Sequence, residues 1–313
     1  MKNAPAMLLA VAGLTLSTAY AQELAATFAS TSADYVQPSD ATPSPDGATF
    51  YFLAIGANGP TLFQVASTGG PVSAIASGAP FVSPGGLAVS TDGRQIYVAD
   101  RYAFAPGGLT GRVFVVPSTG GTPRPVPGTE GFSPRGIEVV AGGDGQDVVY
   151  FSGSNPHANQ VGIYSFSAGG APAAVFEGYP LIEPDGLTIS RSGDVYVADR
   201  GDTPFTGGVF KISSGVVTRV VNSMRPGTPA GLALSFNESR LLVSTLQPYR
   251  TRAQVLTVDL RTNESSAMTD VVGENAGAGG IHRAKDKEVY AWAGVADNGK
   301  KPPHGPIYKI MDK

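Results

Sequence analysis

The side chains best suited to chemistry sit in a recurring motif, Pro-x-Gly followed by an apolar run. Its middle position is Asp185 in one copy and Arg135 in another, with Glu183 and Glu138 close by in the chain. Charged groups held in a partly desolvated place must pair with one another or bind a ligand. Asp185 is therefore a candidate catalytic base, and Arg135 a candidate group for binding a substrate oxyanion or carboxylate.

A second motif, Asp-Arg, ends two apolar runs in the same way, at Asp100-Arg101 and Asp199-Arg200. One interpretation makes Arg101 and Arg200 ligand-binding groups that recognise an anion. The other makes the pair a structural device, in which the aspartate accepts loop amides and the arginine pairs with a neighbouring repeat. We favour the structural interpretation because a repeated residue tends to have a repeated structural role.

The chain has three histidines, His157, His282 and His304. Neutral imidazoles could ligate a transition metal or transfer a proton, which makes His157 and His282 candidate catalytic residues and His304 a candidate ligand-binding residue. The alternative places His157 and His304 in solvated loops and His282 in the interior beside Glu138. We favour the alternative because the three lack the tight spacing of a metal site.

Composition excludes several classes of protein. The chain has no cysteine, which removes disulfides, thiolate metal sites and a cysteine nucleophile. Its formal net charge is −3 and it has no run of basic residues, so nucleic acid is not an expected partner. A nucleophile elbow and a phosphate loop are also missing, because no Gly-rich stretch leads into a helix.

The first 21 residues have the pattern of an export signal. Lys2 precedes an apolar run, and Ala19-Tyr20-Ala21 supplies the small-x-small pattern of a cleavage site. This run is too short to cross a bilayer, which takes about 20 residues. We expect residues 1–21 to be removed, no integral membrane segment, and a secreted or periplasmic protein.

The rest of the chain is a set of repeats, each a Pro-x-Gly strand, a turn with Asp or Gly, and an apolar-aromatic strand. The anchor positions are 40, 86, 136, 186, 231 and 280. Their separation of about 45–50 residues suits four short strands per repeat, which is the period of a propeller blade. We therefore predict an all-β fold over residues 22–313, a single six-bladed β-propeller.

A closed ring needs a partner for the last strand. The chain ends soon after residues 307–310, while residues 24–28 precede the first repeat. We predict that the N-terminal segment completes the last blade, because an unpaired edge would otherwise be exposed.

The loops between the second and third strands of each repeat are the long, polar ones, so they mark the expected binding face. Tyr249 and His304 lie in two of these loops, at 246–253 and 294–305. Six motif positions should surround the channel mouth on this face: Ser39, Gly85, Arg135, Asp185, Ala230 and Gly279. Candidate ligand-binding residues on or near it are Arg101, Arg200, Glu138, Glu183, Tyr249 and His304.

Pro184-Asp185-Gly186-Leu187, followed by Gly193 to Asp199, carries a family resemblance. The sequence resembles the NHL and SMP-30/gluconolactonase-like group of six-bladed propellers. The resemblance implies a lactonase fold with one divalent cation, Ca²⁺ or Zn²⁺, on the channel axis. Asp185 matches one metal-ligand position of that family, whereas the five other mouth positions hold poor or impossible ligands.

Three functions follow as hypotheses. The first is an exported module that binds a small molecule or an extracytoplasmic protein, and we expect it to be a monomer. The alternative is an SMP-30-like hydrolase of a lactone or ester, with Asp185 as base or metal ligand. The second alternative is a propeller similar to virginiamycin B lyase, with one of the histidines abstracting a proton.

Overall fold

The computed structural model shows an all-β protein, and the helical element in its described part is the short 3-10 turn η1 (Pro106–Gly108). It describes residues 23–167, 169–203, 206–227, 229–247, 253–269, 271, 277–295 and 305–313. The predicted export signal lies outside these residues. Within them, none of the helical structure is long and apolar enough to cross a membrane.

Four of the sheets are separate and have four antiparallel strands each. The first contains β2 (Val36–Pro43), β3 (Thr49–Gly56), β4 (Gly59–Ala66) and β5 (Ser73–Ser77). The second contains β6 (Pro84–Val89), β7 (Gln95–Phe104), β8 (Thr110–Pro117) and β9 (Arg124–Pro125). The third contains β10 (Ile137–Ala141), β11 (Asp147–Asn155), β12 (Gln160–Ser167) and β13 (Ala173–Glu177). The last contains β22 (Gly277–Arg283), β23 (Val289–Val295), β24 (Ile307–Asp312) and β1 (Leu24–Ser30).

The remaining strands form one eight-stranded sheet. Its first half contains β14 (Pro184–Ile189), β15 (Val195–Asp199), β16 (Gly207–Ser213) and β17 (Val216–Pro226). Its second half contains β18 (Leu232–Leu234), β19 (Arg240–Leu246), β20 (Ala253–Asp259) and β21 (Ser265–Ala267). The sheets thus show four separate blades rather than the six expected. The reason is the length of β17, whose last two residues, Arg225 and Pro226, pair with β19.

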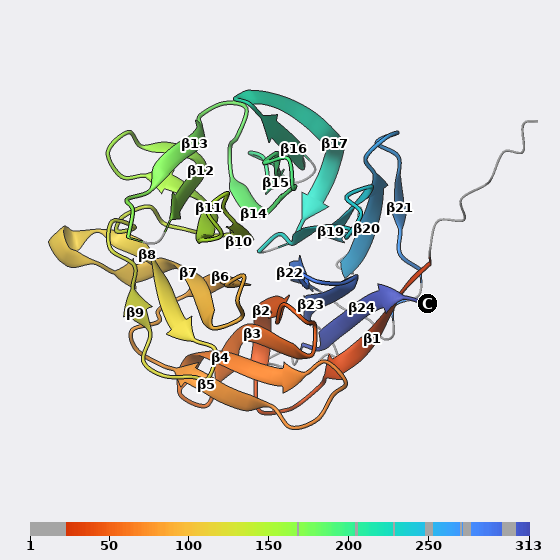
Figure 1. Cartoon of the computed structure of the whole chain (residues 1–313), viewed down its shortest axis with the longest axis horizontal. Helices are drawn as coiled ribbons and strands as arrows, with labels where there is room; N and C mark the ends of the chain where they lie inside the picture. The colour runs from red at the N-terminus through yellow and green to blue at the C-terminus, as the bar shows by residue number, and fades with distance from the viewer. Residues whose placement is uncertain are drawn as a thin grey trace, which may run out of the picture.

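The sheets are arranged like the blades of a propeller around a central axis (Figure 1). Their first strands lie nearest the axis, and the inner strands β2, β6, β10, β14, β18 and β22 contact one another in that order, with β22 returning to β2. The motif glycines make this close approach possible. A Cβ at Gly86 would collide with the carbonyl oxygen of Arg135, and one at Gly136 with that of Asp185.

The turn between the first two strands of a blade is closed by a Ser-x-Asp-Gly pattern. In the second blade the Ser90 hydroxyl donates to Asp92 over 2.7 Å, and the Arg94 amide donates to the same carboxylate oxygen over 3.0 Å. Gly93 follows with φ of 75°, a conformation that glycine adopts without strain. The same pattern at Ser44 and Asp46 explains why the turns recur with the repeat.

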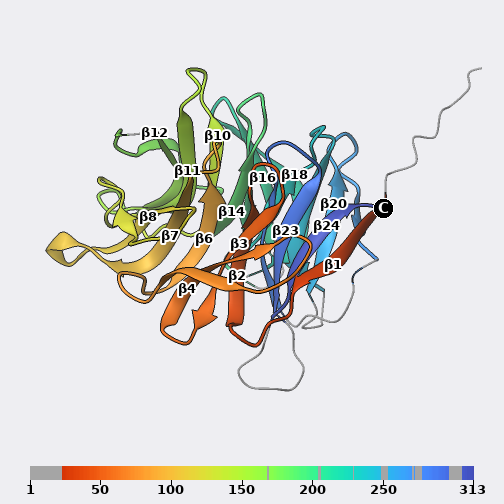
Figure 2. The ribbon, with the colours of Figure 1, turned by 60° about the horizontal axis from the view of Figure 1, so that its bottom comes forward.

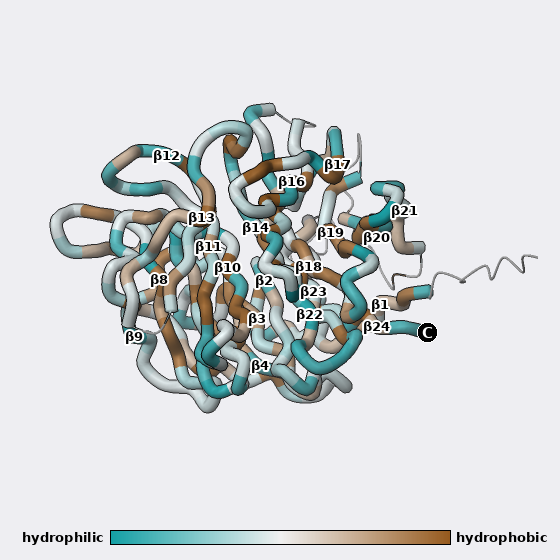
Figure 3. The backbone as a smooth tube through the Cα atoms, turned by 45° about the horizontal axis from the view of Figure 1, so that its top comes forward, coloured by the Kyte–Doolittle hydropathy of each residue, from teal (hydrophilic) through white to brown (hydrophobic). Residues whose placement is uncertain are grey.

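The core lies between neighbouring sheets. Leu53 and Leu62 of the first sheet pack with Leu87, Val98 and Phe114 of the second in one buried cluster. Other clusters join each further pair of neighbours around the ring. Apolar residues accordingly run along the strands, whereas many of the connecting turns are hydrophilic (Figure 3).

The predicted closure is confirmed, because β1 lies beside β24 in both views of the ribbon (Figures 1 and 2). The two strands are antiparallel, with Ala26 opposite Ile310 and Phe28 opposite Tyr308. The first described strand therefore forms the outer edge of the same sheet as the last one.

Candidate functional site

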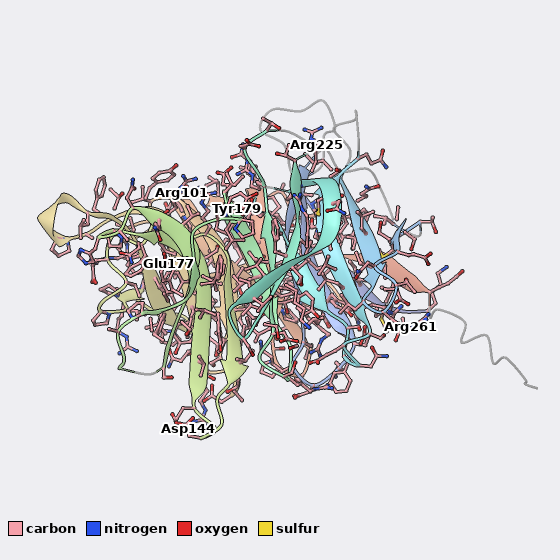
Figure 4. All side chains as sticks on the ribbon, turned by 90° about the horizontal axis from the view of Figure 1, so that it is seen from above. Arg101, Asp144, Glu177, Tyr179, Arg225 and Arg261 are labelled. Carbon is pink, nitrogen blue, oxygen red and sulfur yellow. The ribbon has the colours of Figure 1, made fainter. Side chains whose placement is uncertain are left out.

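A pocket of about 250 Å³ opens at one end of the ring. It is lined by Ser39, Ser83, Pro84, Gly85, Arg101, Tyr102, Pro134, Arg135, Asp185, Arg200 and Pro229. Figure 4 shows Arg101 and Tyr179 at this end and Asp144, on a hairpin turn, at the opposite one. Four of the six expected mouth positions thus line one pocket, whereas Ala230 and Gly279 do not.

Glu183 links two of the arginines of this pocket. Its Oε1 lies 2.6 Å from Arg135 Nη1 and 3.6 Å from Arg200 Nη1. Arg135 comes from the segment before β10, whereas Glu183 and Arg200 flank β14 and β15 in the next sheet. The contact therefore holds two guanidinium groups from neighbouring sheets at the same mouth.

Asp185 is the second residue of β14 and is only 3% exposed. The amide of Ala230 donates a hydrogen bond to its carboxylate, but Oδ1 has no hydrogen-bond partner among the described residues. Burial raises the pKa of Asp185 to about 6, against the opposing charges of Arg135 and Arg200. A carboxyl group that titrates near neutrality in a pocket can act as an acid or a base.

In the two Asp-Arg pairs, the aspartate fits the structural interpretation and the arginine lies where the ligand-binding interpretation needs it. The aspartates cap loop amides, as the structural interpretation predicts: Asp100 accepts from Val82 over 2.7 Å, and Asp199 accepts from Ile182 over 2.8 Å. The following residue of each pair, Arg101 or Arg200, lines the pocket. A repeated structural device thus places two cations at the mouth.

Arg101 differs from the other two arginines in its surroundings. Its guanidinium lies 5.2 Å from the centre of the Tyr102 ring. Among the described residues no carboxylate forms an ion pair with it. The pocket therefore brings three guanidinium groups together with the Asp185 carboxylate, while Glu183, which is not a lining residue, pairs with Arg135 and Arg200 from beside it. With both carboxylates ionised, these five side chains have one positive charge in excess.

His282 lies in the wall of the channel, not in this pocket. Its Nδ1 is 3.2 Å from Glu138 Oε2 and its Nε2 is 3.3 Å from Asp40 Oδ2. Burial alone would lower the pKa of His282, but the charges and hydrogen bonds of Asp40 and Glu138 outweigh it and raise that pKa to about 10. The imidazole is thus protonated at neutral pH and is not available as a base.

Glu138 likewise belongs to the interior. Lys285 Nζ lies 2.6 Å from its Oε1, and this cation together with His282 keeps the pKa of Glu138 below its usual range despite burial. Glu138 and Lys285 line a larger cavity of about 760 Å³, whose other walls include the Gly142-Gly143 turn. This cavity therefore lies toward the hairpin-turn end of the ring, away from the candidate site.

Of the three other predicted residues, only His157 is described, and it does not line the pocket. His157 is exposed in the loop after β11, where its amide donates to Asn155 Oδ1 over 2.9 Å. Tyr249 and His304 lie outside the described residues. Conversely, sequence reasoning missed Tyr102 and Ser83. The signal for Tyr102 was its place directly after the Asp-Arg motif.

The divalent cation implied by the resemblance does not fit these residues. Arg135 brings a positive charge to the mouth, Gly85 has no side chain, and Ser39 is a weak ligand. A Ca²⁺ ion takes six to eight oxygen ligands, and Asp185 supplies only one carboxylate. Within the described parts of the chain no three acidic or histidine side chains are grouped to hold a metal ion.

The architecture is similar to that of solved propeller proteins. A gluconolactonase from Xanthomonas campestris superposes with a TM-score of 0.59 at 12% identity, over 92% of this chain and 90% of that one. A structural-genomics protein proposed to be a gluconolactonase gives 0.62 at 12% identity, over 93% and 92%. A luciferin-regenerating enzyme gives 0.59 at 10% identity, over 92% and 95%. No family model and no curated protein sequence matches the chain.

Proposed function

We propose that this protein is an exported binding module that takes up a small carboxylate at the channel-mouth pocket. The observation that carries the proposal is the convergence of Arg101, Arg135 and Arg200 on one pocket of about 250 Å³. Arginine matches the planar geometry of a carboxylate and binds it through paired hydrogen bonds. Export through residues 1–21, a periplasmic or extracellular location and a monomeric state remain parts of this proposal.

The propeller that carries the site is proposed to have six blades. Its eight-stranded sheet then counts as two blades that are joined only where Arg225 and Pro226 of β17 pair with β19. Two observations support this division. Each half has its own inner strand, β14 or β18. One apolar cluster packs between the two halves, and a separate one packs between the second half and the sheet of β22–β24. The similarity to gluconolactonase-like propellers over most of the chain agrees with it.

Carboxylate binding can be tested by calorimetric titration of the purified protein with small monocarboxylates. We expect Arg101→Gln to weaken binding about tenfold or more, because hydrogen bonds to charged groups contribute about 1.5–3 kcal/mol. Arg94→Gln is the matched control, since Arg94 is exposed and lies outside the pocket. Equal loss in both variants, or no binding to the parent protein, would contradict the proposal.

The second candidate is a hydrolase of lactones or esters, and Asp185 is the observation that favours it. In its ionised form Asp185 would take a proton from water while the water oxygen bonds to the carbonyl carbon. Arg135 or Arg200 would stabilise the oxyanion. The bond between the acyl carbon and the alkoxide oxygen then breaks as the oxyanion reforms the carbonyl, and Asp185 returns the proton to the leaving oxygen, so that acid and alcohol are released.

This hydrolase has a defined pH signature. Activity on a panel of simple lactones should rise with pH through about 6, as Asp185 loses its proton, and should disappear in Asp185→Asn. Activity that survives this substitution would contradict the assignment. The lyase alternative has less support, because His282 is buried and protonated and His157 lies outside the pocket.

A further inference from the structure

The walls of the channel-mouth pocket are apolar between the arginines. Pro84, Pro134 and Pro229 each contribute to them, and a proline has no amide N–H to donate. The hydroxyls of Ser39 and Ser83 are the only uncharged aliphatic hydroxyls among the lining residues. Burying a hydroxyl without a hydrogen-bond partner is unfavourable by about 1–3 kcal/mol, so the proline-lined parts of the wall disfavour ligand hydroxyls that point toward them.

Tyr102 presents an aromatic surface beside Arg101, which forms no ion pair with any described carboxylate. Its side chain is 49% exposed and lines the pocket. Its amide donates to Asp100 Oδ1 over 3.1 Å, so the cap that orders the loop also fixes the backbone that carries the ring. Arg101 and Tyr102 together offer one charged and one aromatic contact on adjacent residues.

The volume and charge of the pocket limit the ligand further. About 250 Å³ corresponds to about eight water molecules at roughly 30 Å³ each, which suits a single ring with a short side chain. Three guanidinium groups face two carboxylates when Asp185 is ionised, so one negative charge on the ligand balances the site. A second ligand carboxylate would approach Glu183 and Asp185 without a spare cation.

We propose that the ligand is a compact aromatic monocarboxylate, with its carboxylate on Arg101 and its ring against Tyr102 and the prolines. This inference rests on the proposed carboxylate binding and specifies its ligand class. It sets this pocket apart from one built for a sugar acid or its lactone, which would need hydrogen-bond partners for several hydroxyls.

Titration of the purified protein with phenylacetate, gluconate, succinate and neutral 2-phenylethanol tests the inference. We expect phenylacetate to bind at least about tenfold more tightly than gluconate or succinate, and the alcohol to bind more weakly than phenylacetate. Tyr102→Ala should weaken phenylacetate binding about fivefold while Tyr102→Phe retains it, as expected for a ring contact of about 1 kcal/mol.

Phe104→Ala is the matched control, because Phe104 is 79% exposed on the same strand but does not line the pocket. Gluconate or succinate binding as tightly as phenylacetate would overturn the aromatic assignment and leave carboxylate binding intact. Equal effects of Tyr102→Ala and Phe104→Ala would also overturn it. If no carboxylate binds, both this inference and the proposed function fail.

Discussion

Replacing Asp185 by asparagine is expected to stabilise the protein at pH 8, by about 2 kcal/mol in the free energy of unfolding. The carboxylate is buried, Oδ1 has no partner in the described part of the chain, and its pKa of about 6 lies above the ordinary value of 3.8. Two pKa units correspond to about 3 kcal/mol of preference for the neutral form, of which we expect most to be recovered. Asparagine keeps the size of the side chain without the charge.

The raised pKa of Asp185 in the folded protein decides how the stability difference between the parent protein and Asp185→Asn changes with pH. The folded protein holds the Asp185 proton over the range from about 4 to 6, in which the unfolded chain releases it. The parent protein should therefore lose stability relative to Asp185→Asn as pH rises through this range, and the two should converge near pH 4. Urea unfolding at pH 4, 6 and 8 measures the difference.

Asp199→Asn is the matched control, and its expected effect has the opposite sign. Asp199 accepts the amides of Ile182 and Gly201, each over 2.8 Å, so an asparagine NH₂ group would face a donor. We expect a loss of about 2 kcal/mol at pH 8. A destabilised Asp185→Asn would show that this carboxylate has a structural partner instead of a vacant place for a ligand.

Gly86→Ala is expected to destabilise the protein by about 3 kcal/mol. The added Cβ would meet the Arg135 carbonyl oxygen and lie 3.3 Å from the Gly136 Cα, both part of the neighbouring backbone. A backbone cannot rotate away as a side chain can, so the two inner strands would have to separate, and such overpacking costs about 1–3 kcal/mol. The midpoint of urea unfolding at pH 7 measures the loss.

The adjacent glycine provides the control. A Cβ at Gly85 would have no atom within 4 Å, so we expect Gly85→Ala to change stability by less than about 0.5 kcal/mol. Similar losses at both positions would mean that an added Cβ is harmful at either motif glycine, whether or not it meets the neighbouring backbone. That result would refute the close approach between inner strands as the reason for the motif glycine.

Much of the fold was predictable because it depends on local patterns that repeat. The turn residues at Asp92 and Gly93, the Pro-x-Gly strands and the N-terminal segment that pairs with β24 all follow from spacing and edge pairing. The joining of two expected blades into one eight-stranded sheet did not follow, because the length of β17 and its contact with β19 are set by tertiary packing.

The candidate site was predictable only in part. The repeat placed Arg135 and Asp185 at the mouth, because each motif position comes to the same level of the ring. The Glu183 contact with two arginines and the buried His282 network depend on side-chain directions across neighbouring sheets, which sequence spacing does not specify. For Tyr102 the only signal was its place directly after Asp100-Arg101, which does not specify that its ring lines the pocket.

The pairing of β1 with β24 has a consequence for the order of events during synthesis. Ala26 is synthesised well before its partner Ile310. Each sheet between them can pair its own strands as it emerges, but the ring cannot close before β24 has been made. A polypeptide halted before β24 would thus expose the unpaired edge of β1 together with buried residues such as Leu24, a state that chaperones recognise and proteases degrade.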